Sequence, residues 1–211
     1  MASKDTKEKI LETALLLFNR DGFVNVRLQH ICDVSIISLG NITYHFKTKD
    51  DIIFALWKKI ESEQKILMAE FKTLPLFEDI DRYIIAQFEL QQKYVFFYTD
   101  TLEIIRSYPV IGEAHRLHTQ WQAQQITFMF SFNEARGVFL KVDEIHYHYL
   151  AKTWLWLSEN WVNRQLILGA DPNHYEEYKE ALWFQLKSSM TQLGKNELQQ
   201  IYQLSKLIEH E

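Results

Sequence analysis

Residues 40–49 bring together several kinds of side chain that can bind nucleic acid. Four polar groups follow one another within about two helical turns: Asn41, Thr43, Tyr44 and His45. Amide, hydroxyl and imidazole groups form hydrogen bonds with base edges and with phosphate oxygens. Lys49 follows at the start of the next predicted helix, where backbone N–H groups and the helix dipole also attract phosphate. The segment therefore predicts a surface that contacts duplex DNA.

A helix that presents these groups to DNA has to be short, and its other face has to be anchored. The major groove is about 12 Å wide, and a recognition helix enters it with one face exposed. Ser38 is a favourable N-cap for a helix that runs to about His45, and Gly40 allows the backbone to approach DNA closely. The expected apolar anchors are Ile31, Ile37, Ile42 and Phe46. With a short helix over residues 28–34, this pattern predicts a helix-turn-helix.

The fold class predicted for the whole chain is all-α, because apolar residues recur at helical spacing and no segment sustains a period of two. Asp5 and Glu8 predict a capping box for the first helix, which ends at Gly22. Beyond residue 45, capping residues, glycines and prolines predict helices over 48–72, 77–93, 94–107, 110–136, 143–168, 174–193 and 197–209. Gly194 is expected to end the helix over 174–193. A domain boundary is predicted inside the fourth helix, which gives domains over 1–50 and 51–211.

Charge and composition narrow the class of protein. The net charge is −5, but residues 1–59 hold 9 basic and 7 acidic side chains, whereas the rest hold 14 and 21. A weakly basic head on an acidic body suits a local DNA footprint. The chain has no uncharged apolar run of 18 residues and no apolar signal core, and its one cysteine, Cys32, cannot form an internal disulfide. We therefore expect a cytoplasmic protein in which Cys32 is a small buried hydrophobic residue.

Aromatic residues dominate the second predicted domain. The helix over 143–168 is apolar nearly all round, so it has to be covered on more than one side. Together with the helix over 174–193 it predicts an isologous two-fold dimer interface. The residues expected there are Trp154, Trp161, Tyr178, Leu182 and Leu186. Candidates to line a pocket for a small apolar or aromatic ligand are Phe88, Phe97, Trp121, Gln125 and Phe128. A place in the packed core is the alternative for each of these rings.

Motifs for catalysis and metal binding are missing from the sequence. It contains no Gly-rich phosphate loop, no nucleophile elbow and no HExxH pattern. His115 and His118 share a helix face, but no cysteine or carboxylate cluster completes a tetrahedral metal site. We therefore expect no enzyme, and no catalytic residue, metal ligand or cofactor.

The order and spacing of several residues between about 6 and 56 agree together with one known family. They are Ile10-Leu11, Ala14, Phe18, Gly22-Phe23, Ile31, Ser38, Gly40-Asn41 and Tyr44-His45-Phe46-Lys47-Thr48-Lys49. In these residues the chain resembles the tetracycline-repressor (TetR) family of bacterial transcriptional regulators, and residues 94–109 resemble a C-terminal subtype more loosely. The resemblance implies a homodimer whose first three helices read a palindromic operator and whose C-terminal helices bind a ligand and dimerise. It implies a ligand-responsive repressor.

Carried over residue by residue, the resemblance implies DNA contacts by Arg27, Ser38, Gly40, Asn41, Thr43, Tyr44, His45 and Lys49. For Tyr44 we expect a mixed role, in which the ring packs and the hydroxyl binds a phosphate. Three positions depart from the family pattern: Ile36 replaces a glycine in the turn, Arg27 replaces an N-cap Thr or Ser, and Leu39 replaces Pro or Lys. A β-branched residue is costly at positive φ. Ile36 thus supports an alternative function, a helical ligand-binding or interaction dimer with a degenerate DNA-binding head.

Overall fold

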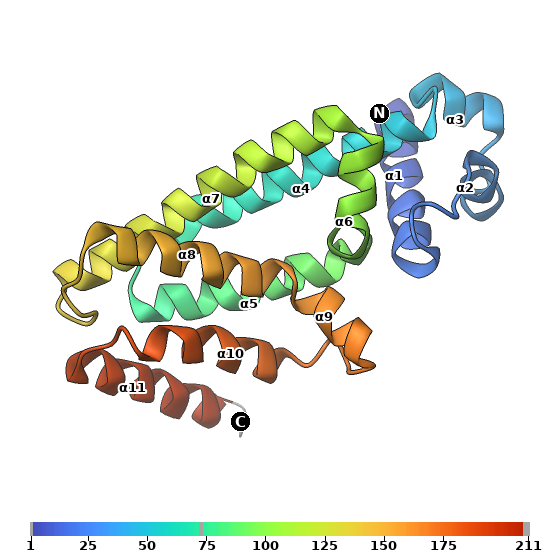
Figure 1. The fold of residues 1–211 in the computed structure, drawn as a ribbon. Coiled ribbons are helices and arrows are strands. Elements are labelled where there is room, and N and C mark those ends of the chain that lie inside the picture. Colours follow the sequence, from blue (N-terminus) through green and yellow to red (C-terminus); the bar gives the residue numbers. More distant parts are fainter. Residues whose placement is uncertain (1, 72–73, 209–211) are drawn as a thin grey trace. The chain divides into compact units, whose positions relative to one another are not determined.

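The computed structural model describes residues 2–71 and 74–208, and in that part the chain forms helices and no strand (Figure 1). The helices are α1 (Ala2–Asp21), α2 (Leu28–Ser35), α3 (Leu39–His45), α4 (Lys49–Phe71), α5 (Phe77–Lys93), α6 (Val95–Ser107), α7 (Pro109–Ala135), α8 (Glu144–Glu159), α9 (Trp161–Leu168), α10 (Tyr175–Lys187) and α11 (Gln192–Ile208). The predicted all-α fold class is confirmed. Within this part, no helix has the length and apolar character needed to cross a bilayer.

Several predicted helix ends are wrong. α1 begins at Ala2, so Asp5 lies inside its first turn and is not its N-cap. The helix predicted over 143–168 is interrupted at Asn160, whose side-chain amide donates to the Trp156 carbonyl at 3.0 Å. An asparagine that hydrogen-bonds to nearby backbone in this way competes with the helical pattern, so α8 ends and α9 begins there.

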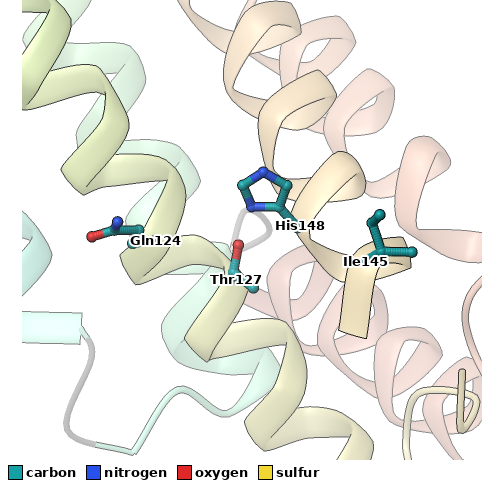
Figure 2. Close-up of a pocket in the computed structure, with 4 residues that line it drawn as sticks. All are labelled: Gln124, Thr127, Ile145 and His148. Atoms are coloured by element: carbon teal, nitrogen blue, oxygen red, sulfur yellow. The ribbon is translucent and has the colours of Figure 1, made fainter. Parts of the chain in front are cut away.

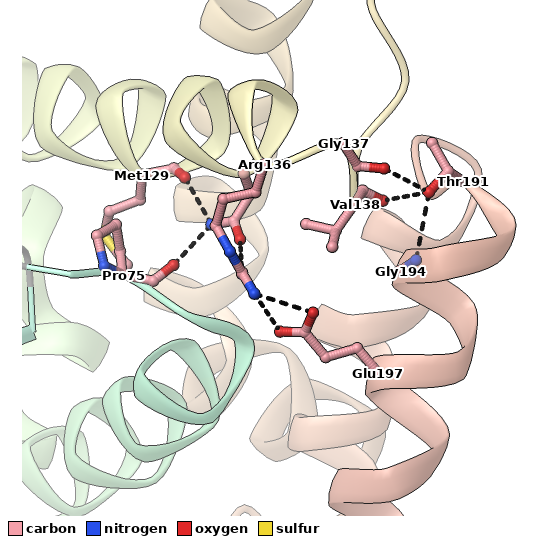
Figure 3. A network of polar contacts seen from close by, with 9 residues as sticks. Pro75, Met129, Arg136, Gly137, Val138, Thr191, Gly194 and Glu197 are labelled. Carbon is pink, nitrogen blue, oxygen red and sulfur yellow. Dashed lines mark hydrogen bonds and ion pairs between the residues drawn. The ribbon is translucent and has the colours of Figure 1, made fainter.

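Gly194 does not end a helix but lies in the first turn of α11. Thr191 is the capping residue here, because its hydroxyl accepts the Gly194 N–H at 3.3 Å and its carbonyl accepts the Lys195 N–H at 3.0 Å. The same hydroxyl donates to the Gly137 carbonyl at 2.8 Å (Figure 3). A methyl group on Gly194 would overlap the carbonyl of Val138. Glycine is therefore required by a close approach of two backbones.

We predict that Gly194→Ala lowers the free energy of unfolding by about 1–3 kcal/mol, the usual penalty for forcing extra atoms into a packed site. The sign is diagnostic, because Gly→Ala inside a helix otherwise stabilises by roughly 0.5–1 kcal/mol. Gly40→Ala in α3 is the matched control, since nothing lies within 4 Å of its would-be Cβ. Urea unfolding of both variants measures the difference, and equal stability of the two would contradict the close approach.

The described residues group into two compact units. The N-terminal unit contains the residues up to 63 together with 93–115, and the C-terminal unit contains 64–92 and the residues from 116 on. Both α4 and α7 continue from one unit into the other. The functional division at residue 50 stays a prediction.

Hydrogen bonds hold α6 to α1 within the N-terminal unit. Asn19 accepts the Phe96 N–H at 3.0 Å and donates to the Lys93 carbonyl at 2.9 Å. Asp100 accepts the N–H of Phe23, directly after α1, at 3.1 Å. These bonds fix the first helix, against which α2 packs, to a scaffold outside the helix-turn-helix.

The core of the C-terminal unit is built from stacked and tilted aromatic rings. Trp154 of α8 lies between Tyr83 of α5 and Phe130 of α7, with ring centroids 6.0 and 6.1 Å away. Phe77 of α5 packs in the same way on Trp183 of α10 at 5.3 Å. Aromatic pairs at these separations are favourable beyond the area they bury. Helices α5, α7, α8 and α10 therefore share one aromatic core.

Candidate functional site

The predicted anchors hold α2 and α3 in place. Ile31, Ile42 and Phe46 are buried, as predicted, and Ile37 is half-buried. Ser38 caps α3, because its hydroxyl accepts the Asn41 N–H at 3.3 Å. The prediction for Cys32 is also confirmed: the side chain is buried, and burial raises the pKa of its thiol.

Ile36 forms the turn between α2 and α3. Its backbone adopts the left-handed conformation, with φ 58° and ψ 34°, and its side chain is 90% exposed. This conformation costs a non-glycine residue about 1–2 kcal/mol. The turn thus keeps the left-handed conformation that glycine would favour, and the chain bears the strain.

The outward face of α3 carries most of the predicted DNA contacts. Ser38, Gly40 and Asn41 are exposed, and Tyr44 is 81% exposed. The Tyr44 ring has the half-buried His45 imidazole edge-on at 5.1 Å. Of the mixed role expected for Tyr44, the packing of the ring is limited to this contact with His45, and both the ring and its hydroxyl are available to a partner.

Thr43 of α3 and Arg27, directly before α2, are two further predicted DNA contacts. The half-buried Thr43 hydroxyl donates to the carbonyls of Leu39 and Gly40 at 2.9 and 3.2 Å, so its oxygen keeps only acceptor capacity. Arg27 is exposed immediately before α2, and its backbone N–H donates to Nδ1 of His30 at 3.3 Å. The Arg27 guanidinium has only donors, so it takes no part in this cap.

Lys49 is placed differently from the prediction. Its ammonium donates to the Phe23 carbonyl and lies 4.9 Å from the centre of the Phe23 ring and 5.7 Å from that of Phe18. Burial lowers the pKa of this ammonium. The side chain therefore braces the start of α4 against α1, and its assignment as a phosphate contact is corrected. Lys47, two residues earlier, is exposed, and the set of predicted DNA contacts does not include it.

The residues predicted to bind a ligand lie in different surroundings. Phe88 is buried against Tyr175 and Tyr178, whereas Phe97 belongs to the N-terminal unit and stacks on Trp57 at 5.1 Å. The others lie on α7: Trp121 and Gln125 are half-buried and Phe128 is exposed.

The described part of the C-terminal unit has cavities at its surface. One, of about 520 Å³, lies between α7 and α8 (Figure 2) and is lined by Gln124, Thr127, Ile145 and His148. Another, of about 260 Å³, lies next to α11 and is lined by Lys187, Met190, Lys195, Leu198, Gln199 and Tyr202. None of the five predicted ligand residues lines either cavity.

Buried polar groups gather inside the C-terminal unit instead. Gln91 of α5 donates to Ser158 of α8 and to the Tyr178 hydroxyl of α10, both at 3.2 Å. Gln87 lies one turn before it on the same face of α5, and one turn after Tyr83, which stacks on Trp154. It therefore faces α8, where both of its amide atoms are buried without a hydrogen-bond partner in the described structure.

Further groups in this unit are buried and unpaired among the described residues. They include Oε1 of Gln122 on α7 and the indole N–H groups of Trp154 and Trp161. Gln122 lies on the face of α7 that carries Phe130, which contacts Trp154. Burial of the Glu159 carboxyl, at the end of α8, raises its pKa to about 7. Buried polar groups are normally hydrogen-bonded, so this interior polar cluster (Gln87, Gln91, Gln122, Trp154 and Trp161) keeps unused hydrogen-bonding capacity among the described residues.

The residues predicted to form the dimer interface are buried within the chain itself. They are Trp154, Trp161, Tyr178, Leu182 and Leu186. Side chains enclosed by their own subunit cannot offer a surface to a second copy, so these five are corrected to core residues. The same helices expose other apolar residues: Tyr149 and Trp156 on α8, and Phe184 on α10.

Comparison with known proteins places this arrangement in a family. A family model described as TetR, bacterial transcriptional repressor, matches residues 62–202. A TetR-family transcriptional regulator from Marinobacter aquaeolei VT8 is 25% identical, with a TM-score of 0.81 over 92% of this chain and 95% of that one. A protein from Saccharomonospora viridis, named as a transcriptional regulator and solved in complex with choline, shares the fold at 22% identity, with a TM-score of 0.68 over 89% and 98% of the two chains.

A curated relative is similar over a shorter stretch. The HTH-type transcriptional regulator AcrR of Shigella flexneri is 31% identical over 70 residues, and this match spans 33% of each chain. The family model covers most of the C-terminal unit, and the Marinobacter structure matches 92% of the chain. The chain belongs to the TetR family of bacterial transcriptional repressors.

Proposed function

We propose that the chain is a sequence-specific DNA-binding repressor that acts as a homodimer on a palindromic operator and responds to a small ligand. The observation that carries the proposal is the exposed outward face of α3, with its anchor side buried. Two such helices, one from each subunit, would enter successive major grooves about 34 Å apart. A ligand that favours another separation of the heads would need a coupling of only ~1–3 kcal/mol to change operator affinity about 5–150-fold.

The DNA-binding part of the proposal rests on groups that are free to meet a duplex. Asn41 and Tyr44 are exposed on α3, and Arg27 and Lys47 are exposed beside it. Amide and hydroxyl groups can contact bases and phosphates, whereas the two cations bind phosphates. Ser38, Gly40, Thr43 and His45 stay in the proposed contact set, with backbone N–H groups contributing at Ser38 and Gly40.

We predict that Tyr44→Ala and Lys47→Ala each lower operator affinity roughly tenfold without changing the melting temperature, since neither side chain supports the fold. Lys49→Ala is the matched comparison and should lower the melting temperature, because its ammonium is held by Phe23 and Phe18. Selection of a two-fold-symmetric site from random duplexes, followed by binding titrations at several salt concentrations, measures these effects.

The alternative, a ligand-binding dimer with a degenerate DNA-binding head, is supported by the strained Ile36. The selection separates the two functions. A functional head enriches one sequence and loses affinity steeply as salt rises. If a folded, dimeric protein enriches no sequence, the repressor proposal is wrong and the alternative stands.

The ligand site that we propose is the interior polar cluster with its aromatic surroundings. Amide groups offer both donors and acceptors, and indole N–H groups offer donors. Burial favours the neutral form of the nearby Glu159 carboxyl by raising its pKa, and none of the five residues of the cluster carries a charge. We therefore propose an uncharged ligand with an apolar or aromatic body and hydrogen-bonding groups at its edge. A protein of the same fold was solved in complex with choline. This supports the binding of a small molecule but does not identify the ligand of this chain.

We predict that Gln87→Leu raises the free energy of unfolding of the ligand-free protein by about 1–3 kcal/mol, because it removes a buried amide that has no partner. The same change should abolish the response to ligand in a reporter assay. Gln91→Leu is the control on the same helix face: it breaks bonds to Ser158 and Tyr178 and should destabilise. A Gln87→Leu variant less stable than the native protein would show that Gln87 has a structural role.

A further inference from the structure

The first turn of α3 exposes an apolar side chain at a position where base edges are read. Leu39, the first residue of α3, is 46% exposed, whereas Ile42 and Phe46 further along are buried. The N-terminal residues of a recognition helix contact base edges in the major groove. A partly exposed leucine is ordinary elsewhere on a protein surface, so it is the position of Leu39 that calls for a function.

The polar groups around Leu39 are mostly occupied within α3. The Ser38 hydroxyl accepts the Asn41 N–H at 3.3 Å, and the Thr43 hydroxyl donates to the Leu39 carbonyl at 2.9 Å. Gly40 contributes no side chain, and no other atom lies within 4 Å of its would-be Cβ. The side chains of the first turn that can read a base are therefore Ser38, through its remaining O–H donor, Asn41, through its amide, and Leu39, through its methyl groups. Leu39 is the apolar one among them.

Thymine is the one base that presents a methyl group in the major groove, at C5, and apolar side chains recognise it by contact. Contact between this methyl group and the leucine removes apolar surface of both from water, which favours thymine over a base without the methyl. We propose that Leu39 is a specificity-determining residue that packs against the C5 methyl group of one thymine in each operator half-site. This inference rests on the proposed DNA-binding function.

The test uses the duplex selected by the native protein and replaces its thymines one at a time with deoxyuridine. This change removes the methyl group and leaves base pairing and the hydrogen-bonding edge intact. At one thymine of each half-site, we expect the affinity of the native protein to fall about fourfold, the factor for one lost methyl contact. Leu39→Ala should bind the thymine and deoxyuridine duplexes equally at that position.

Asn41→Ala is the matched control from the same turn. It should bind both duplexes more weakly and keep the fourfold preference for thymine, because it removes a hydrogen-bonding group and leaves Leu39 in place. The inference is overturned if the native protein tolerates deoxyuridine at every position, if the selected half-sites contain no thymine, or if Leu39→Ala keeps the preference. Failure of the proposed function looks different, since the native protein would then select no duplex at all.

Discussion

Replacing Asp81 with alanine is expected to lower the free energy of unfolding by about 3–5 kcal/mol, the usual result when one partner of a buried ion pair is removed. Asp81 of α5 accepts a hydrogen bond from Nζ of Lys179 and another from Nε1 of Trp183, both 2.8 Å long. Both charged side chains are buried. Without the carboxylate, the Lys179 ammonium would stay in an apolar site beside the rings of Tyr175 and Tyr202, which compensate only part of its lost hydration.

A double-mutant cycle separates the lost pair from the lost packing. Lys179→Met removes the charge and keeps the length of the side chain, so Asp81→Leu with Lys179→Met replaces the pair by apolar groups. Such replacements are often neutral or stabilising. We expect the double variant to regain the stability that the single variants lose through an unpaired charge, while the Trp183 N–H stays without its acceptor. Urea unfolding of the four proteins gives the coupling. If the two single losses simply add in the double variant, the ion pair is not what joins α5 to α10.

The recognition helix could be located from sequence because its signals are local. Ser38 caps α3 by accepting the Asn41 N–H, and Thr48 caps α4 in the same way, since its hydroxyl accepts the Asp51 N–H at 3.4 Å. The Asp51 carboxylate in turn accepts the Thr48 N–H at 2.9 Å. The destination of the Lys49 side chain depends on Phe18 and Phe23, which precede the whole helix-turn-helix. A pattern in residues 40–49 holds no information about that contact. Sequence alone therefore assigns the phosphate contact to Lys49 and not to the exposed Lys47.

The candidate site in the C-terminal unit was harder to predict, because it depends on which face of each helix is covered. Gln87 and Gln91 are spaced like residues on a solvated face of α5, yet packing against α8 and α10 buries both. Trp154 and Trp156 lie two residues apart on a helix that is apolar nearly all round. Only the packing of Tyr83 and Phe130 on Trp154 identifies the core side and leaves Trp156 exposed.

That exposed side supports a revised proposal for the dimer interface. Tyr149 and Trp156 are two helical turns apart on α8, and Trp156 is 58% exposed. The Thr153 hydroxyl, between them on α8, accepts a hydrogen bond from Gln185 of α10 at 2.6 Å. Phe184, which directly precedes Gln185 on α10, is 73% exposed. We propose that this apolar patch of Tyr149, Trp156 and Phe184 meets its own copy across a two-fold axis, since exposed apolar patches mark interaction sites.

We predict that Trp156→Arg combined with Phe184→Arg converts the protein to a monomer and lowers operator affinity at least ~100-fold. A two-fold axis brings each new charge into the interface twice, and a monomer loses the effective concentration that links the two half-sites. Sedimentation and binding titrations measure both effects. Leu102→Arg, an exposed apolar position on α6 in the N-terminal unit, is the control and should leave the assembly unchanged. If the double variant stays dimeric, the second copy binds elsewhere. If it is monomeric with full affinity, the two heads do not bind DNA as a linked pair.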